Sequence, residues 1–213
     1  MIAVFDLDGT LLNTIADLAT AANYALEAGG FEKRTLAECQ RFVGNGITKL
    51  LERALPEGQQ TAQNVAKIRP AFLSYYDDHL ADFTRPYPSI EALLHALSER
   101  GVKLAVASNK YQRATEKLVS RFFAAIPFAA VLGQRENIPV KPDAHIVREI
   151  LSAAGETEKT CLYIGDSEVD MQTAHHAGVR VCAVTWGFRQ REVLEKYTPD
   201  CWADCPSEIL KFI

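Results

Sequence analysis

The sequence predicts an α/β fold, namely a doubly wound parallel sheet with a helical domain inserted into it. Short apolar runs alternate with longer amphipathic segments along most of the 213 residues. The runs are apolar at consecutive positions, a pattern typical of parallel strands that helices cover on both faces. Nearly a hundred residues separate Phe5, at the end of the first run, from Lys103, at the start of the second. Because a crossover between parallel strands needs only about a dozen or more residues, a further domain is inserted here.

The elements of the sheet domain follow from these runs and from the residues that end helices. Two helices are predicted over 89–100 and 168–177, and a third begins with Asp143 as its N-cap and ends at Gly155. All three are followed by a glycine, the residue that most often ends a helix. Around these helices we predict five strands, at 2–5, 103–107, 130–132, 161–164 and 179–184.

The inserted domain covers 14–82, where helical signals occur without strand signals. Thr35 and Glu38 have the spacing of a capping box at the start of one helix. The sheet domain then consists of 1–13 and 83–213, and two short connections join the domains. Such an insertion is typical of a lid that closes over a site, although an insertion without that role remains the alternative. The helices of this domain are predicted over 15–28, 35–42, 47–55 and 60–80.

Charge and composition exclude several classes of protein. The formal net charge is −4, from 23 Lys and Arg against 27 Asp and Glu, so we expect no nucleic-acid partner. No apolar run approaches the roughly 18 to 20 residues of a membrane span, and we expect neither a span nor a signal peptide. The odd number of cysteines, 5, is typical of reduced thiols and predicts a cytoplasmic protein. Cys201 and Cys205 have no second ligand pair nearby, so we interpret them as structural.

Polar residues follow three of the predicted strands, and they define the candidate site. Ligands of open α/β sheets bind at the carboxyl ends of the strands, where loops and helix N-termini converge. Lys141, in the loop just before the helix that begins at Asp143, is expected to face the same crevice. The residues concerned are Asp6 and Asp8 after the first strand, Ser108, Asn109 and Lys110 after the second, Asp166 and Asp170 after the fourth, and Lys141 in the loop.

Three of these carboxylates predict a metal ion. Asp6, Asp8 and Asp166 would repel one another at one edge of the sheet unless a cation neutralised them. Oxygen ligands without a nearby set of His or Cys favour a hard ion, and Mg²⁺ binds to one or two carboxylates while keeping waters and a phosphate oxygen. We therefore expect Mg²⁺ as cofactor. Asp170 is expected to orient Asp166 or a water on the metal.

The neighbouring donors predict that a phosphoryl group binds beside this metal. Ser108, Asn109 and backbone N–H groups can donate to its oxygens, and Lys141 supplies positive charge. A metal next to a phosphate site indicates phosphoryl transfer. The expected ligand is a small phosphorylated metabolite.

The spacing of Asp6 and Asp8 gives each of them a separate chemical role. One residue lies between them, so in an extended segment both side chains project to the same side. Asp6 can attack phosphorus and form an aspartyl phosphate, while Asp8 protonates the leaving oxygen and later deprotonates the hydrolytic water. Taken alone, D-x-D-G-T also fits a calcium-type loop or an ordinary turn after a strand.

Four motifs in order make the chain similar to the haloacid dehalogenase-like hydrolases, and within them to the phosphoglycolate phosphatase-like branch. The motifs are VFDLDGTLLNT, AVASN ending at Ser108, VKPDA with Lys141, and YIGDSEVD with Asp166. The resemblance implies a Rossmann-like core, a helical cap domain over 14–82, Mg²⁺ dependence and an aspartyl-phosphate mechanism. It also implies that Asp6 and Asp166 bind the metal through their carboxylates and Asp8 through its backbone carbonyl.

The inserted domain carries one further candidate for substrate binding. Gly44, Asn45 and Gly46 are similar to the cap loop of phosphoglycolate phosphatases, where a glycine-rich turn lies over the leaving group. Two glycines around Asn45 permit a tight turn before a helix N-terminus, which can face an anionic or hydroxylated substrate. A plain turn between helices is the alternative.

These residues predict a Mg²⁺-dependent phosphomonoester hydrolase, and the resemblance implies 2-phosphoglycolate as its substrate. A β-phosphoglucomutase-like phosphomutase shares the same core, as does a phosphatase of nucleotides, pyrophosphate or sugar phosphates. In a non-enzymatic alternative, the fold binds a phosphorylated partner. The presence of both Asp6 and Asp8 argues against this, because binding alone needs no nucleophile with an adjacent acid.

Overall fold

The structure is a computed structural model that describes all 213 residues, and it divides into two compact units. The first unit comprises Met1–Asn13 and Pro86–Ile213, and the second is Thr14–Arg85. The division on the return connection therefore falls after Arg85, whereas the sequence placed it after Asp82.

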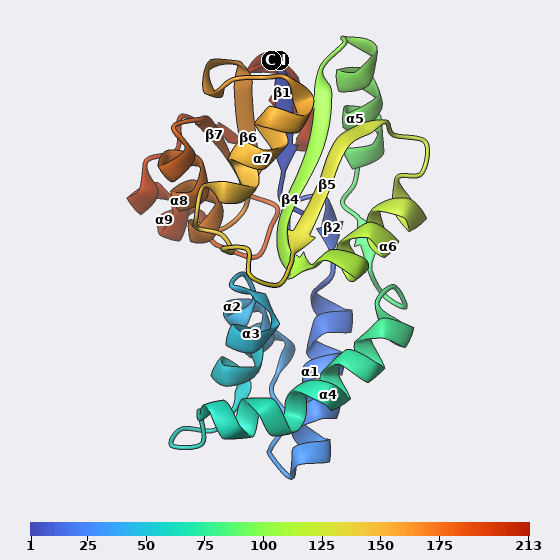
Figure 1. The fold of residues 1–213 in the computed structure, drawn as a ribbon, viewed down its shortest axis with the longest axis vertical. Helices are drawn as coiled ribbons and strands as arrows, with labels where there is room; N and C mark the ends of the chain where they lie inside the picture. Colours follow the sequence, from blue (N-terminus) through green and yellow to red (C-terminus); the bar gives the residue numbers. More distant parts are fainter. The chain divides into compact units, whose positions relative to one another are not determined.

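A six-stranded sheet forms the centre of the first unit (Figure 1), with the order β5-β4-β1-β6-β7-β8. Every neighbouring pair of strands is parallel, which confirms the predicted fold class. All five predicted strands are present, and the short edge strand β8 was not predicted. A separate two-stranded sheet pairs β2 (Leu12–Asn13) with β3 (Arg85–Pro86). The six strands are β1 (Ile2–Phe5), β4 (Lys103–Tyr111), β5 (Phe128–Gln134), β6 (Cys161–Gly165), β7 (Arg180–Val184) and β8 (Cys201–Ala203).

Five α-helices connect these strands, and three of them differ from the prediction, since α9 was not predicted either. The helix after Asp143 begins one residue later, with Ala144 in the N-cap position, so the predicted N-cap was wrong. Asp143 nevertheless accepts a hydrogen bond from His145 N (2.8 Å), so it still satisfies a free donor of the first turn. The helix α6 was not predicted. The helices are α5 (Ile90–Glu99), α6 (Gln112–Phe122), α7 (His145–Ala154), α8 (Glu168–Ala177) and α9 (Arg191–Leu194), with 3₁₀ turns at Glu158–Thr160, Glu195–Tyr197 and Pro206–Lys211.

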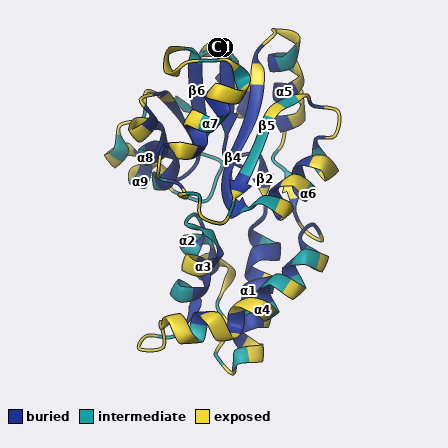
Figure 2. Ribbon diagram, in the orientation of Figure 1, coloured by how far each residue is buried: buried dark blue, intermediate teal, exposed yellow.

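Both faces of the sheet are buried, which explains the continuous apolar runs in the sequence (Figure 2). Ile2, Val4 and Tyr163 pack with residues of α7 and α8 in one cluster on one face. Alternate residues of a strand point to opposite faces, and Phe5 is equally buried on the other side. Burial of such a side chain stabilises the fold by roughly 1.5–3 kcal/mol.

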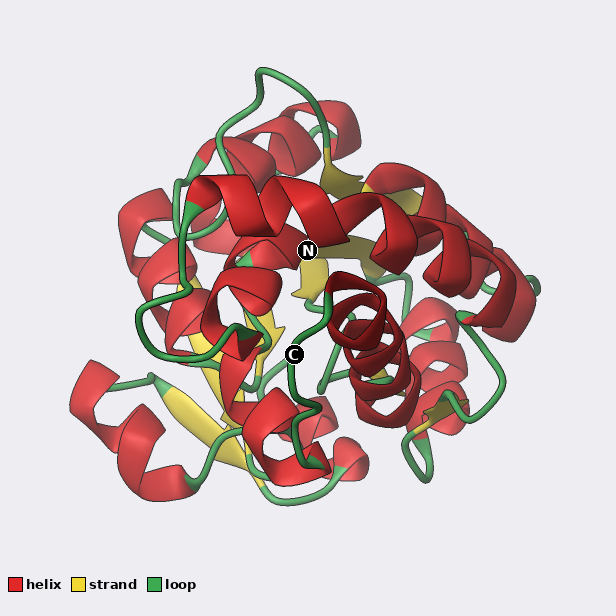
Figure 3. Ribbon diagram, turned by 90° about the horizontal axis from the view of Figure 1, so that it is seen from below, coloured by secondary structure: helices red, strands yellow, loops and turns green.

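The second unit is a bundle of four helices. In the whole chain, most of the residues outside the sheet are helical (Figure 3). The predicted capping box of Thr35 and Glu38 is present. Buried Asp17 accepts hydrogen bonds from Thr84 N (2.8 Å) and Thr84 Oγ1 (2.6 Å), so it fixes the return segment to the first helix. None of the helices in the structure combines the length and the apolar character that crossing a bilayer requires. The helices are α1 (Ile15–Gly29), α2 (Leu36–Phe42), α3 (Gly46–Ala54) and α4 (Ala62–His79).

Candidate active site

The end of β1 places Asp6 at the centre of the site. Its backbone N–H donates to Ile164 O (2.9 Å), which continues the pairing of β1 with β6. Its Oδ1 accepts hydrogen bonds from Leu7 N (2.7 Å) and lies 3.0 Å from Lys141 Nζ. No hydrogen bond reaches Oδ2. One oxygen of Asp6 is therefore fixed, while the other has a free lone pair.

Asp8 follows in a turn that an isolated bridge to Leu12 closes. Its Oδ1 forms an ion pair with Lys110 Nζ at 3.1 Å, and only 2% of the lysine side chain is exposed. This lysine was noted among the polar residues after the second strand, but no role was predicted for it. In the structure it holds the carboxylate that the sequence assigns to proton transfer.

Ser108, Asn109 and Lys110 lie within β4, whereas the sequence placed them after the strand. The register against β5 shifts between Ala107 and Tyr111, so this end of the strand departs from regular pairing. Ser108 Oγ accepts from Lys110 N (3.2 Å), which leaves the hydroxyl hydrogen to donate elsewhere. Ser108 and Asn109 are both buried.

Lys141, in the loop between β5 and α7, extends its buried ammonium group between two carboxylates. Nζ lies 2.7 Å from Asp170 Oδ1 and 3.0 Å from Asp6 Oδ1. It also contacts Ala107 O (2.9 Å) and Tyr163 Oη (3.0 Å). Burial disfavours the charged amine, but Asp170 and Asp6 raise the pKa of Lys141 well above its usual value. The ammonium ion is therefore held protonated.

The first turn of α8 supplies Asp170, whose two oxygens are both engaged. Ser167 is the N-cap of this helix and forms a capping box with Asp170. Asp170 Oδ2 accepts from Ser167 N (3.0 Å) and Ser167 Oγ (2.6 Å). Oδ1 accepts from Lys141 Nζ and from Tyr163 Oη (3.1 Å). One carboxylate thus joins the end of a helix to the lysine of the site.

Asp166, just before this helix, lies where two glycines allow close packing. Its Oδ1 accepts from Thr10 Oγ1 (3.0 Å) and its Oδ2 from Phe188 N (2.7 Å). A Cβ at Gly9 would lie 2.4 Å from Asp166 Oδ2, and one at Gly187 would lie 2.2 Å from Asp166 Cβ. Real Cβ atoms essentially never approach other atoms so closely. Only glycine fits at these two positions without displacing the carboxylate.

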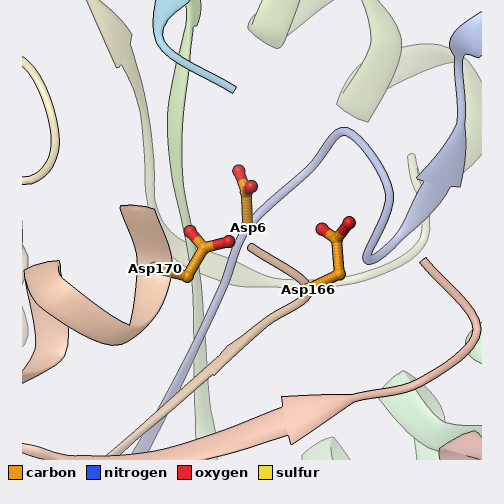
Figure 4. Close-up of side chains that lie close together, drawn as sticks. All are labelled: Asp6, Asp166 and Asp170. Atoms are coloured by element: carbon orange, nitrogen blue, oxygen red, sulfur yellow. The ribbon is translucent and has the colours of Figure 1, made fainter. Parts of the chain in front are cut away.

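Asp6, Asp166 and Asp170 form one buried acidic cluster, in which an oxygen of each lies within 4.8 Å of the others (Figure 4). Burial, followed by the charge of Asp170, raises the pKa of Asp6 well above its usual range and that of Asp166 to about 7. The ammonium ion of Lys141 lies beside two of the three carboxylates, Asp6 and Asp170. The cluster therefore has an excess of negative charge that a cation would neutralise.

The structure thus brings together all the predicted site residues of the sheet unit: Asp6, Asp8, Ser108, Asn109, Lys141, Asp166 and Asp170. Sequence reasoning missed several residues around them. Thr10, Gly187 and Phe188 N all contact Asp166, and of these only Thr10 lies in a motif noted above, D-x-D-G-T. Trp186 donates from Nε1 to Thr10 O (3.0 Å). No sequence pattern indicated that Tyr163 contacts the site, because a tyrosine within an apolar strand is expected to be a core residue.

The predicted substrate loop, Gly44 to Gly46, belongs to the helical unit. Asn45 occupies the N-cap position of α3, but its side chain does not cap the helix. Its Oδ1 accepts instead from Arg53 Nη2 (2.8 Å), and Arg53 Nη1 donates to Phe42 O (2.9 Å). Arg53, in the last turn of α3, therefore fixes both sides of the loop, which the sequence did not reveal.

Comparisons with known proteins agree with this geometry. Residues 3–184 match the sequence model of a family described as haloacid dehalogenase-like hydrolase. A phosphoglycolate phosphatase from Mesorhizobium japonicum is 36% identical over 91% of this chain and 86% of its own length. One from Aquifex aeolicus is 28% identical over 100% of this chain and 96% of its own. A crystal structure from Lactobacillus delbrueckii subsp. bulgaricus, proposed to be a phosphoglycolate phosphatase, superposes with a TM-score of 0.93 at 34% identity and covers 100% of this chain and 97% of that one.

Proposed function

The chain belongs to the haloacid dehalogenase-like hydrolase family, and on that premise we propose that it is a Mg²⁺-dependent phosphomonoesterase that converts 2-phosphoglycolate into glycolate and phosphate. The curated relatives named phosphoglycolate phosphatase, which match along most of the chain, support this substrate. We also propose that the enzyme acts in the cytoplasm, where its five free cysteines would stay reduced.

One observation carries the proposal: Asp6 presents a carboxylate oxygen without a hydrogen bond beside a buried ammonium ion. Lys141 Nζ and Leu7 N hold Oδ1 of Asp6, and this fixes the direction of Oδ2. A nucleophile held in this way needs little reorganisation before it attacks. A phosphate-binding protein without catalysis would gain nothing from a carboxylate held in this way, because the carboxylate repels the phosphate.

The acidic cluster fits a divalent cation. Oxygens of three buried carboxylates lie within 4.8 Å of one another. Burial, followed by the charge of Asp170, raises the pKa of Asp166 to about 7, and a bound cation would favour its ionised form. Asp6 and Asp166 would bind Mg²⁺ through their carboxylates and Asp8 through its backbone carbonyl. Asp170 is less suited as a ligand, because each of its oxygens already accepts two hydrogen bonds, whereas each oxygen of Asp166 accepts one. When bound, Mg²⁺ supplies positive charge that lowers the repulsion between the carboxylates and the phosphate.

The residues of the chain then account for two chemical steps. Oδ2 of Asp6 attacks phosphorus, the bond to the glycolate oxygen breaks, and Asp8 transfers a proton to that oxygen. In the second step Asp8 removes a proton from water, which attacks the aspartyl phosphate and restores Asp6. Ser108 donates its hydroxyl hydrogen to a phosphoryl oxygen, and Lys141 compensates the charge that develops near Asp6. Lys110 keeps Asp8 in place for both proton transfers.

The helical unit is proposed to act as the cap that selects the substrate. Its loop Gly44 to Gly46 combines positive φ angles at both glycines with the free N–H groups of the α3 N-terminus. Such a turn suits the carboxylate of phosphoglycolate. Arg53 would keep the loop in shape during binding.

A substrate panel tests the proposal. Purified protein with Mg²⁺ should hydrolyse phosphoglycolate with a higher kcat/KM than sugar phosphates, nucleotides or pyrophosphate. The Asp6→Asn variant, purified in the same way, controls for contaminating phosphatases. A higher kcat/KM on one of the other substrates would refute the substrate, and absence of phosphatase activity on every compound would refute the reaction.

A further inference from the structure

The position of Lys141 in the chain raises a structural question. Its ammonium group must lie within hydrogen-bond distance of both Asp6 and Asp170, yet the residue belongs to a loop without strand or helix pairing. A lysine side chain has four rotatable bonds, so its end is placed accurately only if its backbone is fixed. Backbone N–H and C=O groups buried in a loop also need partners.

Asn109 provides both of these partners. Its Nδ2 donates to Lys141 O (2.9 Å), and its Oδ1 accepts from Lys141 N (2.8 Å). Both residues are buried, with 5% of Asn109 and 2% of Lys141 exposed. The side chain thus forms the two bonds that a neighbouring strand would otherwise make with the backbone of Lys141. The pair also fixes the orientation of the carboxamide, because only Nδ2 can donate and only Oδ1 can accept.

This arrangement separates Asn109 from its neighbour Ser108. The Ser108 hydroxyl keeps a hydrogen for a ligand, whereas the Asn109 carboxamide is engaged on both sides by the backbone of Lys141. The sequence assigned both residues to phosphate binding. The geometry instead links Asn109 to Asp6 through the lysine.

We propose that Asn109 is a positioning residue: it holds the backbone of Lys141 so that the ammonium group bridges Asp6 and Asp170. This inference rests on the proposed phosphatase function and deepens it. Asn109 lies on β4 and Lys141 follows β5, its neighbour in the sheet, so the clamp also joins the loop to the strand that carries Ser108.

Asn109→Ala removes both bonds and tests the proposal through the two kinetic constants. We expect kcat to fall by about 10- to 100-fold, because displacing a catalytic group by about 1 Å has effects of this size. The rise in KM should be smaller than the fall in kcat. A rise in KM with unchanged kcat would overturn the proposal and support direct substrate contact. Asn109→Asp keeps the size of the side chain and loses the donor to Lys141 O, so it serves if the alanine variant fails to fold.

The helical unit provides a matched control. Asn23 makes the same reciprocal pair with a backbone, donating from Nδ2 to Arg34 O (2.8 Å) and accepting from Arg34 N (2.7 Å). Asn23→Ala should lower the melting temperature in a similar way while kcat stays within about twofold of wild type. Equal losses of kcat in the two variants would mean that Asn109 contributes only to stability.

A measurement without turnover keeps this inference separate from the proposed function. Amide hydrogen exchange by NMR should show the N–H of Lys141 protected in the wild type and exchanging much faster in Asn109→Ala. Unchanged protection would overturn the clamp even if the phosphatase reaction is confirmed. Loss of protection in a protein without phosphatase activity would support the clamp while refuting the function.

Discussion

Replacing Asp166 with asparagine should stabilise the metal-free protein at pH 8 although it removes a ligand of the proposed metal. Burial and the charge of Asp170 raise the pKa of Asp166 from 3.8 to about 7. The folded state therefore binds this proton more tightly than the unfolded state does. The stability that the protonated group contributes is complete below about pH 4, and it is lost as the pH rises through about 7.

The raised pKa of Asp166 determines how much Asp166→Asn should stabilise the metal-free protein. A difference of about three pKa units corresponds to roughly 4 kcal/mol, at 1.36 kcal/mol per unit. Asparagine stays neutral at every pH and keeps both hydrogen bonds, because Thr10 can accept from its amide and Phe188 N can donate to its oxygen. Without metal, Asp166→Asn should thus exceed the wild type by up to about 4 kcal/mol at pH 8 and match it near pH 4.

Urea unfolding followed by circular dichroism, in the presence of a chelator, measures this difference at both pH values. Saturating Mg²⁺ at pH 8 should then stabilise the wild type and not the variant. Asp78→Asn, at an exposed position of α4, serves as a control and should change little at either pH. Equal stability of Asp166→Asn and wild type at pH 8 without metal would refute the reasoning, because the buried charge of Asp166 would then not lower the free energy of unfolding.

Three further changes test the roles of single residues. Asp6→Asn should leave the fold intact and abolish turnover, and near-normal kcat would exclude Asp6 as the nucleophile. Asp8→Asn should slow alkyl phosphates more than activated aryl phosphates, whose leaving groups need no proton; equal losses on both would argue against Asp8 as the acid. Gly187→Ala should displace Asp166 and raise the Mg²⁺ concentration for half-maximal activity roughly 10- to 100-fold. An unchanged Mg²⁺ requirement would show that the loop containing Gly187 moves and Asp166 stays in place.

Much of the fold could be predicted because its strands are buried on both faces. The runs around Val4 and Ile164 are apolar at every position, and this identifies central parallel strands without knowledge of the partners. The carboxyl ends of such strands share one edge of the sheet, so Asp6 and Asp166 were expected to lie close together. The family comparison confirmed the resemblance found in the motifs.

Other features depend on contacts between distant segments and leave no local signal. Strand β8 consists of three residues whose pairing with β7 defines them as a strand. The pairing of Asn109 with Lys141 joins positions 32 residues apart, and an asparagine after a strand gives no indication of its partner. The close approach of Gly187 to Asp166 is likewise set by the path of the loop after β7.

The carboxylate of Asp170 has a consequence for how the enzyme loses activity. Asp170 lies in the first turn of α8; one of its oxygens accepts from Ser167, the N-cap of the helix, and the other accepts from Lys141. Fraying of that turn would release the ammonium ion from its anchor at the same moment. Warming should therefore inactivate the enzyme by a local opening, at temperatures where the sheet is still intact, and inactivation would precede global melting.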